Sequence, residues 1–341
     1  DFHYIVRHHG KEIYKGRIKD IKAEPGQTVT SPFLNGIPAT NSSTGDVRIE
    51  FYAAIRTPEP FLPAGTVIAR EQTYAHTFHK EDAPKQAFAG SEEDDRQVVF
   101  SGPHFKATFD KQSGLLVSYR YKKQEYIHNG QGPRPFFWRA PTDNDYGAKL
   151  PVRLKAWKEA SYQEPKAESF NVVRDKDTTA VKVTYRFPQT DARWDITYKV
   201  YGNGVIKVDN HFVAENAQTP MIPRVGLRMR LPARITSLTY YGRGPEENYR
   251  DRRTSQFIGE YTSGIQDMYE PYVRPQENNH RTDIYWCTLT SKAKEGLLFV
   301  ADRTFEMNVS NYPLESLDSG ESIENGSPRT EKTNHRHLTD P

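Results

Sequence analysis

The feature that most constrains this chain is a two-residue alternation of apolar and polar side chains. The clearest runs cover residues 181–187, 194–200 and 225–231, where every second residue is aliphatic or aromatic. This period is typical of strands with one buried face. Turn signals, including Asn-Gly at 129–130 and Gly-Asn-Gly at 202–204, separate such runs. The pattern therefore predicts an all-β chain of antiparallel sheets, with one helix around residues 154–162.

The strands divide into two regions. Residues 1–79 contain a strand, a His-Gly turn and further strands, which predicts a small antiparallel sandwich of immunoglobulin-like size whose first strand is missing. Residues 80–96 are acidic and nearly free of β-branched side chains, so they are expected to form a linker. A larger all-β domain is expected over residues 97–341, with a long surface loop at 314–334 and without its final strands.

Charge and hydropathy exclude two classes of partner. The chain has 47 basic and 44 acidic residues, a net charge of +3, so neither nucleic acid nor an anionic membrane is an expected partner. It has no apolar run of about 18 residues, so no membrane-spanning helix is expected. The only cysteine, Cys287, lies in an apolar run and is expected to be a buried thiol. None of these features indicates a cellular compartment.

Three polar segments could carry chemistry. In segment 136–147, an aromatic triplet precedes Arg139, Asp143 and Asp145, which could bind an ion or a sugar hydroxyl or could close a turn. In segment 241–253, glycines flank Arg243, and Glu246 lies near several arginines, which also suits a charged loop network.

Segment 267–286 mixes aromatic rings with amides and charges, as sugar sites do. The candidate substrate-binding residues across all three segments are Asp143, Asp145, Arg243, Glu246, Tyr269, Glu277, Asn278, His280 and Arg281.

Several common active sites are not indicated. The pairs His8-His9 and His335-Arg336-His337 are poorly spaced for chelation on a strand, so no metal site is expected. No Ser/His/Asp motif, phosphate loop or dinucleotide fingerprint is present. Glycoside hydrolysis requires two carboxyl groups across a cleft, and spacing in sequence does not measure that distance. No catalytic residue is therefore assigned.

The three segments resemble signatures of one enzyme family. Segment 139–147, Arg-Ala-Pro-Thr-Asp-Asn-Asp-Tyr-Gly, is similar to a motif of the small-chain region of glycoside hydrolase family 2 β-galactosidases. Segments 242–252 and 269–281 resemble two further motifs, and His335-Arg-His-Leu338 resembles a fourth. The motifs follow the family order over residues 99–338, and residues 1–78 resemble the preceding immunoglobulin-like domain.

The resemblance implies a fold and a parent enzyme. The fold is an immunoglobulin-like β-sandwich followed by a large antiparallel supersandwich of the galactose-mutarotase-like type. The parent is a retaining glycosidase that hydrolyses terminal β-D-galactosides. Its catalytic glutamates, and the Mg²⁺ and Na⁺ ligands, belong to an upstream TIM barrel outside this chain, so no cofactor is expected here. The expected partners are that barrel, the N-terminal domains, a further copy of the enzyme and carbohydrate.

Two residues depart from the family pattern. Asn279 replaces a usual glycine, and asparagine tolerates the left-handed conformation better than most residues. Arg250 replaces a frequent proline, which releases a fixed φ angle.

Three functions fit these features. The first is a non-catalytic scaffold and interface portion of a β-galactosidase, and the second is a carbohydrate-binding module. The third is a mutarotase-like epimerase, for which Glu277 and His280 are the nearest base and acid pair.

Overall fold

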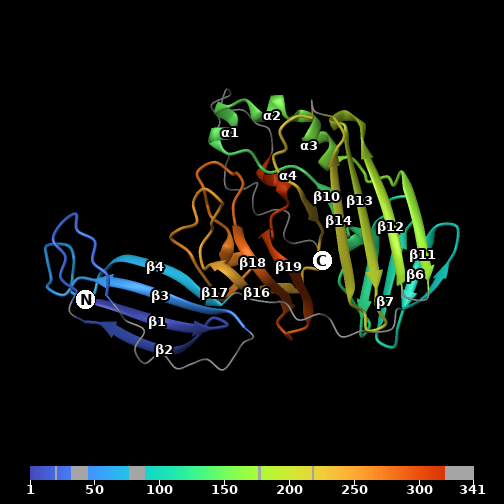
Figure 1. Cartoon of the computed structure of the whole chain (residues 1–341). Helices are drawn as coiled ribbons and strands as arrows, with labels where there is room; N and C mark the ends of the chain where they lie inside the picture. The colour runs from blue at the N-terminus through green and yellow to red at the C-terminus, as the bar shows by residue number, and fades with distance from the viewer. Residues whose placement is uncertain (20, 32–44, 77–88, 176–177, 217–218, 319–341) are drawn as a thin grey trace.

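The computed structural model describes residues 1–19, 21–31, 45–76, 89–175, 178–216 and 219–318. Within these residues the chain is built from antiparallel sheets with a few short helices, which confirms the all-β prediction. Figure 1 shows three groups of strands side by side, with α1–α3 gathered at one end. No helix in these ranges is long and apolar enough to span a membrane.

The first sheet has the strand order β2-β1-β3-β4. Its strands are β1 (Phe2–His8), β2 (Lys11–Ile18), β3 (Val47–Ala54) and β4 (Val67–His76). His9 (φ 47°) and Gly10 (φ 77°) join β1 to β2, and their two positive φ angles are those of a type I′ hairpin turn. Tyr4, Val6, Val47 and Ile49 form its buried face.

Two sheets face each other in the second group. One has the order β5-β6-β7-β8-β9 and the other the order β11-β12-β13-β14. The strands of the first are β5 (Gly90–Glu93), β6 (Gln97–Ser101), β7 (Phe105–Asp110), β8 (Leu116–Tyr121) and β9 (Gln124–Glu125). Those of the second are β11 (Ser169–Asp175), β12 (Thr178–Phe187), β13 (Ala192–Val200) and β14 (Ile206–Ala214).

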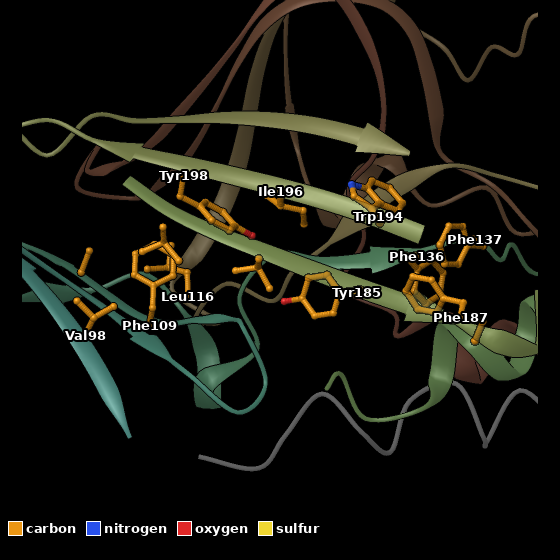
Figure 2. Packing of buried hydrophobic residues seen from close by; sticks show 14 of the residues in the cluster. Val98, Phe109, Leu116, Phe136, Phe137, Tyr185, Phe187, Trp194, Ile196 and Tyr198 are labelled. Atoms are coloured by element: carbon orange, nitrogen blue, oxygen red, sulfur yellow. The ribbon is translucent and has the colours of Figure 1, made fainter. Parts of the chain in front are cut away.

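Inward-facing residues of these two sheets make the largest core (Figure 2). Along β13 buried and half-buried positions alternate strictly, as the sequence period predicts. Phe109 of β7 lies 5.1 Å from Tyr198 of β13, measured between ring centroids. Phe137 is fully buried among aromatic rings and lies 4.8 Å from Trp157 and 4.9 Å from Phe187. The aromatic triplet at 136–138 therefore ties the following motif to this core.

The third group is a sheet with the order β17-β16-β18-β19. Its strands are β16 (Ile235–Gly244), β17 (Phe257–Gly264), β18 (His280–Ser291) and β19 (Gly296–Asn308). A separate pair joins β10 (Arg134–Phe136) to β15 (Gly226–Arg228). The core of this group includes Leu238, Tyr240, Ile284 and the buried Cys287.

The helical segments are short. They are η1 (His128–Gly130), α1 (Asp143–Gly147), α2 (Leu150–Arg153), α3 (Lys155–Tyr162), η2 (Pro188–Thr190), η3 (Gln266–Met268) and α4 (Leu314–Leu317). The helix predicted around 154–162 is confirmed as α3. The expectation of a single helix was wrong, because α1, α2 and α4 have only four or five residues and leave no periodic signal.

Three other local expectations differ from the structure. The strand predicted over 225–231 pairs only at Gly226–Arg228, between prolines at 223 and 232 that cannot donate to a ladder. Within the expected linker, Gly90–Glu93 form the edge strand β5, whose Glu93 pairs with Lys111 at 2.7 Å. In the expected 314–334 loop, α4 occupies the first residues; positions 319–341, including the His-Arg-His-Leu motif, lie outside the described ranges.

Candidate functional site

The first and third motif segments meet near the start of α1, where the 139–147 segment leaves the core. Thr142 and Asp145 form a capping box: the Asp145 amide donates to the Thr142 hydroxyl at 3.3 Å, and the Thr142 amide donates to the Asp145 carboxylate at 3.1 Å. Arg139 also donates to both carboxylate oxygens of Asp145, at 2.7 and 3.0 Å. Asp145 is therefore a structural residue of this turn.

The two aspartates of this motif point to different surroundings. Asp145 is buried, while the exposed Asp143 pairs with Arg274 at 3.3 Å. Residues two apart on a helical turn do not share a face, so the pair cannot grip one ion or one hydroxyl together. Arg274 also lies over the Tyr146 ring, 3.7 Å from its centroid, which fastens the 271–275 loop to α1.

Glu277 brings the third motif to the first. Its amide donates to the Ala140 carbonyl at 3.0 Å, and its side chain is 3% exposed. Arg224 forms an ion pair with the Glu277 carboxylate, and the Asn308 side chain donates to the same oxygen at 2.8 Å. Sequence reasoning missed Arg224 and Asn308, because neither lies in a motif and both reach Glu277 from distant segments.

His280 begins β18 and is held on both ring nitrogens. Nδ1 lies 2.8 Å from the Asn308 amide oxygen, and Nε2 lies 2.9 Å from Glu306. The Tyr249 ring stacks on the imidazole at 4.9 Å. Burial alone raises the pKa of Glu306, but the hydrogen bonds from Arg250 and His280 outweigh burial and hold that pKa below its usual value. His280 therefore pairs with Glu306, whereas Glu277 pairs with Arg224.

The second motif forms a charged loop network around Arg243. Its guanidinium donates to Asp283 at 2.8 Å and to the Gln256 carbonyl at 2.8 Å. The Gln256 amide in turn donates to Glu246 at 2.8 Å. The fully buried Asn248 closes the loop by donating to the carbonyls of Arg243 and Glu246.

The remaining candidates also have internal partners. Arg281 is buried and donates to the Tyr240 hydroxyl at 3.2 Å and to the Pro245 carbonyl at 3.1 Å. Tyr269 packs against Tyr312, with centroids 4.5 Å apart. Asn279 adopts a φ of 64°, the left-handed conformation in which an asparagine can replace glycine.

The motif residues around Glu277, called the motif cluster below, include three buried side-chain atoms without a hydrogen-bond partner within the described ranges. They are the Tyr249 hydroxyl and the side-chain oxygens of Asn278 and Asn279. Burial is the main cause that raises the pKa of Tyr249, and Glu277 and Glu247 raise it further. The phenol therefore remains protonated and can donate a hydrogen bond.

The open space beside the cluster is small. A cavity of about 160 Å³ adjoins Arg139 and Asp145, and its other walls are mostly apolar, including Trp138, Leu154 and Ile222. Pockets that enclose small ligands usually measure about 300–1,000 Å³. No group of three His, Cys, Asp or Glu side chains among the described residues is arranged to hold a metal ion. Whether the nine candidate residues bind a substrate stays a prediction.

A family model described as the β-galactosidase small chain matches residues 101–337. The β-galactosidase of Priestia megaterium is 32% identical over 250 residues, which cover 72% of this chain and 24% of that protein. The β-galactosidase of Lactobacillus delbrueckii subsp. bulgaricus is 31% identical over 309 residues, 89% of this chain and 29% of that protein.

The Streptococcus thermophilus β-galactosidase shows the same relation, with 30% identity over 88% of this chain and 28% of its own length. The chain thus spans less than a third of these curated relatives. The match to the small-chain model extends over more than half of the chain and includes all three motif segments described above. The chain belongs to the β-galactosidase small-chain family.

Proposed function

We propose that this chain is the non-catalytic scaffold and interface portion of a retaining β-galactosidase. The hydrolysis of terminal β-D-galactosides would then depend on carboxylates in other parts of the same enzyme. The shared motifs and the short span relative to the curated relatives support this assignment.

The observation that carries the proposal is the internal pairing of the acidic motif residues. Asp145 is held by Arg139, Glu277 by Arg224 and Asn308, and Glu246 by Gln256. A retaining glycosidase needs one carboxyl group free to attack and another able to give up its proton. Ion pairs and hydrogen bonds of this kind fix the position of the side chain, so they suit a packing role.

An activity assay tests this proposal. The purified chain is incubated with an aryl β-galactoside, alone and with the remainder of the enzyme supplied in trans. We expect no hydrolysis by the chain alone and hydrolysis by the recombined parts. Hydrolysis by the chain alone, lost in a Glu277→Gln variant, would contradict the scaffold role.

A carbohydrate-binding module is the second candidate. The unpartnered Tyr249 hydroxyl and Asn278 oxygen beside Glu277 favour it, because sugar hydroxyls could satisfy both. Calorimetric titration with galactose and lactose tests it, with Tyr249→Phe as the variant expected to lose binding. Flat heats at millimolar sugar would oppose this function.

A further inference from the structure

A larger cavity lies apart from the motif cluster, between the end of α3, strand β10 and the end of β12. Its volume is about 470 Å³, within the usual range for small-ligand sites. It is lined by Arg134, Pro135, Ala160, six consecutive residues from Gln163 to Glu168, and Tyr185 to Pro188. None of these residues belongs to a family motif quoted above.

Two polar groups in the wall of this cavity lack partners. The Tyr185 hydroxyl and the Arg134 Nε atom are buried, and neither has a hydrogen-bond partner among the described residues. Tyr185 itself is only 2% exposed. Both residues line this one cavity. Most buried donors in folded proteins have a partner, so two unpartnered donors in the wall of one cavity favour a ligand with an acceptor group.

The orientation of Arg134 is fixed by the protein. Its Nη2 atom donates to the carbonyls of Ser161 and Gln163, which keeps Nε away from them. Burial is the main cause that lowers the pKa of Arg134, and Glu164 only partly offsets it. No carboxylate of the described residues lies within ion-pair distance of this guanidinium. Arg134 is thus a half-buried cation with no ion-pair partner in the part of the chain that the structure describes.

The lining of the cavity also favours an anion that carries hydroxyl groups. Three charged side chains in the lining are basic and two are acidic. One basic and one acidic side chain, Arg186 and Glu168, already form an ion pair at 2.7 Å. Gln163 and Lys166 supply further polar groups, and Pro135, Pro165 and Phe187 supply apolar walls. Small-ligand sites combine such walls with a few polar groups.

We propose that this cavity binds a small hydroxylated carboxylate of the sugar-acid class. Its carboxylate accepts hydrogen bonds from Arg134 Nε and the Tyr185 hydroxyl, and its ring lies against the proline and Phe187 walls. The inference does not depend on the proposed β-galactosidase role, because the cavity shares no residue with the motif cluster.

The loop over the cavity permits entry. Gln163 is held by Glu159 at one end, and Ala167 and Glu168 are held by Gln112 and Thr184 at the other. Between them, the amides of Glu164 and Lys166 donate to no described backbone carbonyl. Few backbone hydrogen bonds make local opening inexpensive, so this stretch can shift to uncover the two buried donors.

Calorimetric titration of the chain with D-galacturonate and with D-galactose tests this proposal. The two sugars differ only at C6, which is a carboxylate in galacturonate and a hydroxymethyl group in galactose. We expect galacturonate to bind and galactose to bind at least tenfold more weakly at this cavity. In the Tyr185→Phe variant, galacturonate affinity should fall about tenfold, because one hydrogen bond to a charged group is lost. Folding should survive, since removing an unpartnered hydroxyl leaves no buried polar group behind.

Tyr198→Phe is the matched control. Its hydroxyl is also buried and unpartnered, but Tyr198 does not line the cavity. The Tyr198→Phe variant should bind galacturonate with the same affinity as the unmodified chain. Any one of three results would overturn the proposal. These are no heat with galacturonate, equal affinity of the chain for both sugars, and equal affinity of the two phenylalanine variants for galacturonate. Binding at the motif cluster is distinguishable, because Tyr249→Phe and not Tyr185→Phe would then weaken it.

Discussion

At the scale of single residues, Glu277 is the buried charge on which the motif cluster depends. It is 3% exposed and is matched by Arg224, whose side chain is a quarter exposed. A buried charge is tolerated only when a partner and additional hydrogen bonds replace its water. Asn308 supplies such a hydrogen bond at 2.8 Å, so Glu277 joins three segments of the chain.

Replacement of Glu277 by Gln should lower the free energy of unfolding by about 3 kcal/mol, because Arg224 loses its counterion in a buried site. Glu159→Gln is the control. Glu159 pairs with Lys155 at 3.4 Å, but both side chains are more than half exposed, so the expected change is about 0.5 kcal/mol or less. Urea unfolding followed by tryptophan fluorescence measures both. Equal midpoints for the two variants would show that the buried pair does not stabilise the fold.

Cys287 gives a second prediction for a single side chain. It is 3% exposed, and burial raises its pKa from 9.0 to about 12. A thiol with a raised pKa stays protonated as the pH rises past its ordinary value, and only the thiolate reacts readily. At pH 8 the folded chain should therefore react very slowly with a disulfide reagent and rapidly in denaturant. Because the chain has one cysteine, a fast native reaction would directly contradict its burial.

At the scale of elements, α1 depends on Thr142, the residue that precedes it. The helix has five residues, too few to be stable by its own hydrogen bonds, and the Thr142–Asp145 capping box satisfies its first amides. Thr142→Ala should cost about 1 kcal/mol of unfolding free energy. Thr254→Ala, at an exposed position in a surface loop, should change stability little. Thermal unfolding of the two variants compares them, and an equal Tm would argue against the cap.

The alternation of side chains predicts the strands well and the short helices poorly. Strand β13 follows its period at every residue, since one face packs on the core and the other meets solvent. A four-residue helix such as α2 spans barely one turn, so no period can show in its sequence. Its formation depends on contacts with neighbouring segments instead.

The motif cluster shows the same limit of sequence-based prediction, for contacts between segments that are far apart in the sequence. The motifs identify Asp145, Glu277 and His280 as residues that matter, but they do not show which partners hold them. Arg224 lies 53 residues from Glu277 in the sequence, and Asn308 lies 28 residues from His280. Such partners are brought together by sheet packing, which one sequence without its fold does not reveal.

At the scale of the whole molecule, the first sheet is joined to the third group of strands by buried polar contacts. Asp46 is fully buried and accepts hydrogen bonds from Arg48, at 2.7 and 3.1 Å, and from the Tyr241 hydroxyl of β16. Arg48 also donates to Tyr285 of β18 at 3.0 Å. Gln72 adds two hydrogen bonds to the backbone of Ile258 on β17, each 2.9 Å long. Figure 1 shows β1–β4 beside these strands.

These contacts predict that the first sheet and the third group unfold together. Tyr241→Phe removes the hydroxyl that donates to the buried Asp46 carboxylate, and a hydrogen bond to a charged group contributes about 1.5–3 kcal/mol. Scanning calorimetry should show one main transition for the unmodified chain and a clearly lower Tm for the variant. Tyr74→Phe, whose ring is 61% exposed on β4, should leave Tm unchanged. If both variants melt like the unmodified chain, the Asp46 network does not couple the two parts, and the other contacts between them, including those of Gln72 and Arg70, hold the first sheet.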